Sequence, residues 1–92
     1  MGKFEVILKP QAERDIAVLE KSGNKATLKK IKKIFLELSE HPSKGIGRPE
    51  LLKHELSGYW SRRLNSKDRL IYEIIEEPHR KVVVVSALGH YE

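Results

Sequence analysis

Cysteine is absent from this sequence of 92 residues. Its absence excludes a disulfide framework, a thiol nucleophile and a thiolate zinc site, so the fold has to be stabilised by packing. Long apolar runs are also missing: the stretch 82–88 is much too short to cross a bilayer, and the first residues lack the apolar stretch of a signal peptide. We therefore expect a protein of the reducing cytoplasm with no membrane association.

Negative charge is the scarcer sign. The sequence has 18 Lys and Arg residues against 13 Asp and Glu residues, which gives a formal net charge of +5. This excess suits a polyanionic partner, with nucleic acid as the first candidate, although a basic surface that only keeps a protein in solution has the same composition. The length fits one compact domain over residues 1–92 and is too short for two.

Periodicity in the first half predicts a strand and two helices. Alternating apolar residues over 4–8 indicate the strand, and Pro10 opens a helix that ends near Ser22. Asn24 can cap a second helix, which ends at His41. The apolar stripe of the second helix consists of Leu28, Ile31, Phe35 and Leu38. These helices should form a hairpin.

The second half is strand-like. Residues 43–50 are rich in Gly and Pro and lack periodicity, which indicates a loop or an irregular edge segment. Strands are predicted over 59–64, 69–75 and 81–88, joined by short polar turns into an antiparallel meander. Because strands and helices do not alternate regularly, the predicted fold class is α+β, with the helices on one face of the sheet and the other face free for a ligand.

The most informative segment is 45–64, which reads GIGRPELLKHELSGYWSRRL. With the downstream run 69–72 (RLIY) and the run 89–91 (GHY), it closely resembles the YoeB/Txe toxins of the RelE superfamily, and the resemblance covers essentially the whole chain. It implies a RelE-like microbial ribonuclease fold and a toxin of a toxin–antitoxin system. The implied activity is a metal-free mRNA endoribonuclease without a cofactor, which cleaves in the ribosomal A site by 2′-OH attack and so inhibits translation.

The resemblance also implies partners. These are a cognate antitoxin protein, the 70S ribosome with its mRNA, and operator DNA bound only as the toxin–antitoxin complex. It leaves a homodimer open.

A metal-free ribonuclease needs a base for the ribose 2′-OH, an acid for the leaving 5′-oxygen and cations for the phosphorane charge. By the resemblance, Glu50 matches the base, His90 the acid and Arg69 the stabilising cation. The substrate-binding residues that the resemblance implies are Lys53, Arg63 and Tyr91.

Each of these residues also has a purely structural interpretation. Glu50 could be a solvated loop carboxylate, and His90 could belong to a frayed chain end. Arg69 could form a half-buried ion pair with a glutamate on the same face of its strand. Arg62 and Arg63 point to opposite faces, so at most one of them can line the surface that carries Arg69.

The remaining candidates are expected to be structural. Trp60 and Tyr72 lie in well-patterned strands and are predicted to be core aromatics. The other histidines, at positions 41, 54 and 79, have no metal-site spacing and are expected to be solvated. A lysine-rich face of the second helix is a solvated surface by default, with a grip on ribosomal RNA as the alternative. Its members are Lys25, Lys29, Lys30, Lys32 and Lys33.

Two rival functions stay open. A ParE-like gyrase poison would have the same fold but lacks the Glu, Arg and terminal His set, so the joint presence of Glu50, Arg69 and His90 favours the nuclease. A non-catalytic RNA-binding module would only hold RNA on a basic sheet. Such a module would tolerate His90→Gln, whereas a nuclease would lose cleavage and keep binding.

Overall fold

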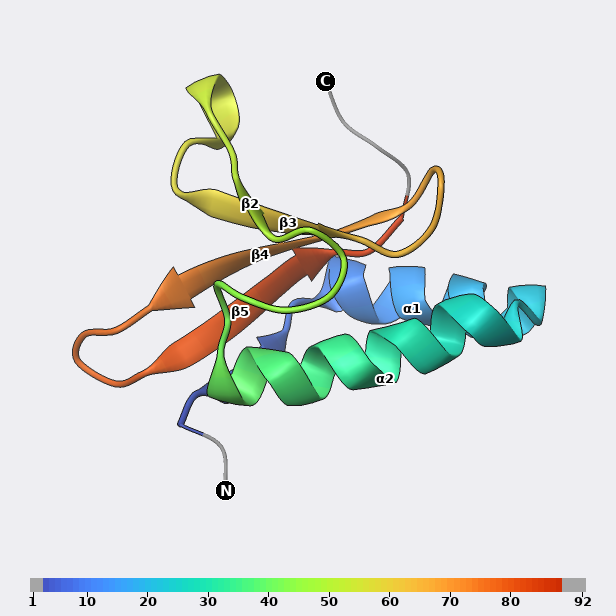
Figure 1. Cartoon of the computed structure of the whole chain (residues 1–92), viewed down its shortest axis with the longest axis horizontal. Coiled ribbons are helices and arrows are strands. Elements are labelled where there is room, and N and C mark those ends of the chain that lie inside the picture. The colour runs from blue at the N-terminus through green and yellow to red at the C-terminus, as the bar shows by residue number, and fades with distance from the viewer. Residues whose placement is uncertain (1–2, 89–92) are drawn as a thin grey trace.

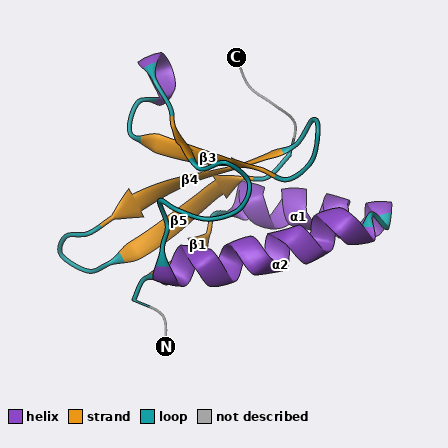
Figure 2. Cartoon of the chain, in the orientation of Figure 1, coloured by secondary structure: helices purple, strands orange, loops and turns teal. Residues whose placement is uncertain are grey.

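A computed structural model describes residues 3–88 of the chain. The elements are β1 (Glu5–Leu8), α1 (Pro10–Ser22), α2 (Lys25–Glu40), β2 (Glu50–Leu51), the 3₁₀ turn η1 (His54–Leu56), β3 (Tyr59–Arg63), β4 (Arg69–Ile75) and β5 (Lys81–Ser86). The strands form one sheet of five in the order β1-β5-β4-β3-β2. Both helices lie on the same side of this sheet (Figures 1 and 2), which confirms the predicted α+β class.

The helix boundaries follow the local signals in the sequence. Pro10 is the first helical residue of α1, and Gly23 ends that helix with a φ of +74°, a value that glycine adopts without steric cost. The Asn24 side chain accepts a hydrogen bond of 3.1 Å from the Thr27 N–H and so caps α2. The predicted hairpin of two helices is therefore confirmed.

The three long strands are also where the pattern places them, except that β3 ends at Arg63 rather than at residue 64 and β5 ends at Ser86 rather than at residue 88. β5 pairs with β4 in antiparallel fashion and with β1 in parallel, so the sheet is mixed. This central place explains the nearly continuous apolar sequence of β5. The segment predicted as a loop or irregular edge ends in β2, a strand of two residues that pairs with β3.

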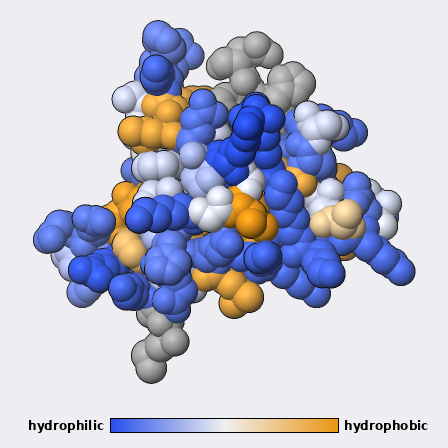
Figure 3. All heavy atoms as spheres, viewed as in Figure 1, coloured by the Kyte–Doolittle hydropathy of each residue, from blue (hydrophilic) through white to orange (hydrophobic). Residues whose placement is uncertain are grey.

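One face of the sheet packs on the helices and makes the core. Tyr72, Val82 and Val84 of the sheet are fully buried there, with Ile34 and Leu38 of α2. The single tryptophan packs partly buried against the same cluster, so both predicted core aromatics are confirmed. The surface seen in Figure 3 is largely hydrophilic, with apolar residues in small separate groups. Neither helix within residues 3–88 is long and apolar enough to span a membrane.

Candidate active site

Strand register aligns Glu50 with the sheet face that is turned away from the helices, called the open face below. Directly paired residues form a row across four strands. The row consists of Glu50 in β2, Ser61 in β3, Ile71 in β4 and Ser86 in β5. Directly paired residues share a face, and successive residues alternate between faces. Because Arg62 points into the helix layer, where it meets Glu37 of α2, its neighbour Ser61 and the rest of this row lie on the open face.

Two arginines form the next row of the open face. Arg63 and Arg69 are Cα partners across β3 and β4, and Arg63 is exposed. The Arg69 side chain is 30% exposed, and its Nη1 lies 3.9 Å from Oε1 of Glu50, whose side chain is 64% exposed. Like charges placed directly opposite each other repel, so this pair of guanidinium groups is suited to an anion.

The ion pair between Arg69 and Glu50 links β4 to β2, with β3 between them. An exposed pair at this distance contributes little to stability. Both groups remain available to a ligand. Glu50 is solvated, as its structural interpretation expects, but it lies in a paired strand rather than in a loop and faces a cation.

Arg62 is buried and holds the loop that precedes β2. Its Nη1 donates to Oε1 of Glu37 at 2.6 Å, and its Nε donates to the Tyr72 hydroxyl at 3.1 Å. Its Nη2 donates to three carbonyl oxygens of the loop, those of His41, Pro42 and Lys44. A single side chain thus holds several backbone carbonyls of this loop in place.

The same loop is packed too closely to admit side chains at two glycines. A Cβ at Gly45 would collide with the Glu37 carboxylate, and one at Gly47 would lie 2.9 Å from the Arg63 carbonyl oxygen. Gly47 has a φ of +85°, and its own carbonyl accepts a 2.6 Å hydrogen bond from the Arg63 N–H. The loop is therefore tied to β3 immediately before it delivers Glu50 to the open face.

Tyr72 completes the support of this loop. Its hydroxyl donates to the Pro42 carbonyl at 2.7 Å, and the Arg62 guanidinium lies over its ring, 5.9 Å from the centroid. Burial raises the pKa of Tyr72 above its usual value, although the hydrogen bond and the charge of Arg62 act in the opposite direction. The hydroxyl therefore stays protonated and keeps donating at neutral pH.

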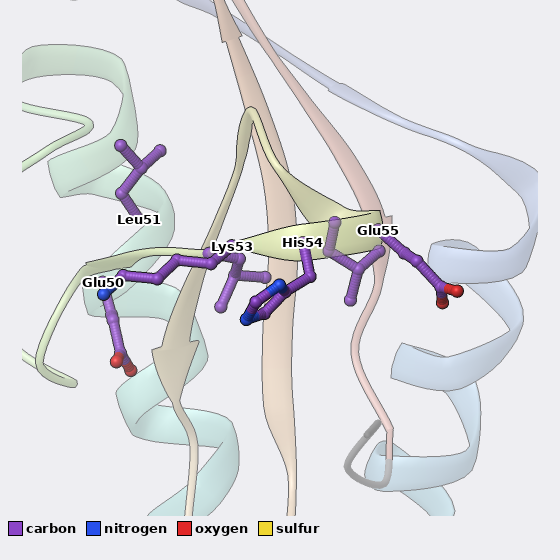
Figure 4. A pocket seen from close by; sticks show the side chains of 7 residues that line it. Glu50, Leu51, Lys53, His54 and Glu55 are labelled. Carbon is purple, nitrogen blue, oxygen red and sulfur yellow. The ribbon is translucent and has the colours of Figure 1, made fainter.

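Lys53 lies on an arm that projects from the rest of the molecule after β2 (Figure 1). Together with β2, the arm lines a hollow of about 480 Å³ with residues 50–56. In Figure 4 the Lys53 side chain runs in the direction of Glu50, whereas Glu55 points away from both. His54, also on the arm, is exposed as expected for a solvated histidine. Lys53 thus adds a cation next to the open face.

His90 and Tyr91 lie outside the described residues. The chain leaves β5 at Ser86, in the same row as Glu50, and the next residue is anchored. The Ala87 N–H donates at 2.9 Å to Oδ2 of Asp15, a buried carboxylate of α1. Within the described ranges, no group of three or more His, Asp or Glu side chains is arranged to hold a metal ion.

The structure therefore brings Glu50, Arg63 and Arg69 together, and Lys53 lines the same hollow as Glu50. Sequence analysis missed the two side chains that fix the surrounding backbone, Arg62 and Asp15. Opposite strand faces were predicted for Arg62 and Arg63, but the acceptors of Arg62 are mostly backbone carbonyls, which leave no trace in a sequence. An acidic residue on the apolar stripe of α1 was the available signal for Asp15.

Comparisons with known proteins agree on one family. Residues 9–91 match the family described as the YoeB-like toxin of bacterial type II toxin–antitoxin systems. Toxin YoeB of Synechocystis sp. is 43% identical over 70 residues, which is 76% of this chain and 78% of that relative. Toxin YoeB of Escherichia coli K12 is 35% identical over 68 residues, which is 74% of this chain and 77% of that relative.

Solved structures give the same result. The YoeB–YefM heterotetramer of Staphylococcus aureus contains a chain that is 31% identical, with a TM-score of 0.78 over 96% of this chain and 98% of that one. The YoeB dimer of the same organism is 32% identical, with a TM-score of 0.78 over 97% and 99% of the two chains.

Proposed function

Because the chain belongs to the YoeB-like toxins of bacterial type II toxin–antitoxin systems, we propose that it is a ribosome-dependent endoribonuclease that cleaves mRNA in the A site. The single observation that best supports this proposal is the 3.9 Å approach of Glu50 and Arg69 on the open face, with Arg63 as the strand partner of Arg69. A carboxylate beside two guanidinium groups combines a proton acceptor with cations for a phosphate.

The reaction assigned to this site is an internal transesterification of RNA. Glu50 accepts the proton of the ribose 2′-OH, and the 2′-oxygen attacks the adjacent phosphorus. The bond from phosphorus to the 5′-oxygen breaks, and His90 gives that oxygen a proton. The products are a 2′,3′-cyclic phosphate and a 5′-hydroxyl. Arg69 and Arg63 stabilise the negative charge that develops on the phosphorane oxygens.

Substrate contacts in this proposal come from the borders of the site. Lys53 on the projecting arm contacts a neighbouring phosphate, and Tyr91 orients or stacks on the nucleotide at the cut. The ribosome presents the message in the required geometry, since binding energy from a large surface can orient the reacting groups of a sparse site.

The partners follow from the family. The related chain of S. aureus is in a complex with YefM in one structure and in a dimer in another. We infer that this chain binds a cognate antitoxin over the open face, where acidic groups of the antitoxin take the place of RNA phosphates. We also infer a cytoplasmic complex that binds its operator DNA, and a homodimer of the free toxin.

The test is cleavage in a reconstituted translation reaction with mapped message ends. Wild-type protein should cut at the A-site codon and leave cyclic-phosphate ends, and Glu50→Gln and His90→Gln should abolish cleavage while ribosome binding persists. Glu55→Gln is the matched control, because Glu55 is an exposed glutamate of the same arm that points away from Glu50. It should cleave as the wild type does.

Other outcomes would support the rival functions. Intact message at high protein concentration, together with inhibition of gyrase supercoiling, would favour a gyrase poison. Wild-type effects on translation that persist in His90→Gln would favour a non-catalytic RNA-binding module.

A further inference from the structure

Ser61 has a buried hydroxyl with no partner. The residue is 1% exposed, and its Oγ is the one buried side-chain nitrogen or oxygen among the described residues that makes no hydrogen bond. Removing a hydroxyl from water without giving it a partner destabilises the folded state, so native proteins rarely keep such a group without a reason. An unsatisfied hydroxyl within a candidate active site suggests that its partner arrives when the site is at work.

The position of Ser61 in the sheet narrows the choice of partner. Its Cα partners on the open face are Glu50 on one side and Ile71 on the other. Ile71 has no polar side-chain atom. Directly paired side chains have Cβ atoms roughly 5 Å apart, which lets a glutamate carboxylate reach a serine Oγ. Glu50 is thus the acceptor that the register supplies.

The Glu50 side chain can rotate to bring its carboxylate to the Ser61 hydroxyl. Its side chain is 64% exposed, and its carboxylate makes only a loose contact of 3.9 Å with Arg69. A carboxylate has two oxygens and can accept from the Ser61 hydroxyl with one while the other faces a ribose 2′-OH. A substrate that covers the open face would remove competing water and strengthen this hydrogen bond.

We propose that Ser61 is a positioning residue, whose hydroxyl donates to the Glu50 carboxylate in the reactive complex. The inference rests on the proposed function. The hydrogen bond orients the carboxylate and favours its ionised form, which is the form that can accept a proton. The other charged groups on or beside this part of the open face are Lys53, Arg63, Arg69 and Glu73. Three of these four groups are cations, which also favour a charged carboxylate over a neutral one.

The experiment is single-turnover cleavage on stalled ribosomes across a pH series, for wild type, Ser61→Ala and Ser86→Ala. Ser86 is the matched control, because it is a serine in the same row of the open face, with β4 between it and Ser61. In Ser61→Ala the cleavage rate constant should fall by about ten-fold to a hundred-fold, the effect of losing a hydrogen bond to a charged group. The acid limb of its pH–rate profile should move to higher pH.

Two further readouts exclude a structural role. The melting temperature of Ser61→Ala should equal or exceed that of the wild type, because the Ser61 hydroxyl makes no hydrogen bond within residues 3–88. Its affinity for the ribosome should be unchanged. Ser86→Ala should match the wild type in rate and pH profile.

The outcomes separate this inference from the proposed function. A wild type that does not cleave would refute the proposed nuclease itself. If the wild type cleaves and Ser61→Ala has an unchanged rate and pH profile, the positioning role alone is refuted. A lowered melting temperature with parallel loss of activity, or a loss of ribosome affinity alone, would also overturn it.

Discussion

At the scale of residues, two consecutive arginines lie on opposite faces of β3, so their substitution should have different effects. Arg62 is fully buried and ion-paired with Glu37 at 2.6 Å, whereas Arg63 is exposed on the open face. Arg62→Met should lower the free energy of unfolding by about 3–5 kcal/mol, because it removes the buried charge partner of Glu37 and the hydrogen bonds from that guanidinium to the loop carbonyls. Arg63→Met should change it by no more than about 0.5 kcal/mol and should instead slow cleavage.

Urea denaturation and the reconstituted cleavage reaction measure the two effects. The substitutions are matched in chemistry and differ by one position in the chain, so each is the control of the other. Equal losses of stability in both variants would contradict the assignment of the two side chains to opposite layers.

Tyr72 should make the stability of the folded protein depend on pH in the alkaline range. Burial raises the pKa of its hydroxyl above 10.0, so the protonated tyrosine contributes stability that is complete below pH 10 and is lost as the pH rises through the raised value. Absorbance titration of the folded protein should therefore show one tyrosine that ionises later than it does in urea. Tyr72→Phe should abolish this late step and cost about 1 kcal/mol at neutral pH, because its hydrogen bonds are removed.

A tyrosine titration curve identical in folded and urea-treated wild type would show that Tyr72 is not held in the interior. The partly exposed Tyr59 serves as the control, since Tyr59→Phe should leave the late step in place.

Strand alternation predicted that Arg62 and Arg63 point to opposite faces of β3, and the structure confirms this because strand periodicity is local. The choice of Glu50, Arg63 and Arg69 as site residues came from the family resemblance, and the contacts that support them could not be predicted. Ser61 and Glu50 became neighbours only through β2, which no local pattern indicated. The pair of Arg62 and Glu37 spans 25 positions, and such long-range pairs have no periodicity to reveal them.

At the scale of elements, the long helices and strands could be predicted from the sequence, whereas the shortest strand could not. The helices and the three long strands each have a period that extends over several residues, and their ends have recognisable caps or turns. β2 has two residues, too few for any alternation, and follows backbone with positive φ at Gly45, Gly47 and Arg48. It exists because the loop is tied to Arg62 and to the β3 backbone, which are tertiary causes.

Asp15 links an element of the helix layer to the end of β5. Asp15→Leu should lower the free energy of unfolding by about 1–3 kcal/mol, because the Ala87 N–H would be buried without an acceptor. It should also slow cleavage, since Ala87 is three positions before His90. Thermal melting and single-turnover cleavage measure the two effects. Gln11→Ala is the control: Gln11 is exposed and also bonds to Asp15, and its removal should change stability by at most about 0.5 kcal/mol.

Full cleavage activity in an Asp15→Leu protein that melts well above the assay temperature would show that this anchor does not affect the reaction. Activity lost in proportion to unfolded protein alone would lead to the same conclusion.

At the scale of the whole molecule, two groups of positive charge lie on opposite sides of the sheet. One part is the arginine pair on the open face, and the other is the outer side of α2, where Lys25, Lys29 and Lys33 are exposed. Because the helices lie on the side of the sheet away from the open face, these lysines are separated from Glu50 by the sheet (Figure 1). If these lysines act in function, we expect them to bind a second phosphate surface, which under the proposed function would be ribosomal RNA.

Lys25→Glu combined with Lys29→Glu tests this second surface. The two lysines are four positions apart on one helix face, and glutamates near the start of a helix are favourable, so α2 should remain folded. Cleavage should weaken at moderate salt and depend less steeply on salt, with a log–log slope smaller by about 0.7–0.9 for each phosphate that the variant no longer neutralises. Lys3→Glu with Lys9→Glu is the control, because both pairs of reversals change the net charge from +5 to 5 − 4 = +1. If both double variants show the same salt dependence, only overall charge matters, and the lysine face of α2 is a solvated surface.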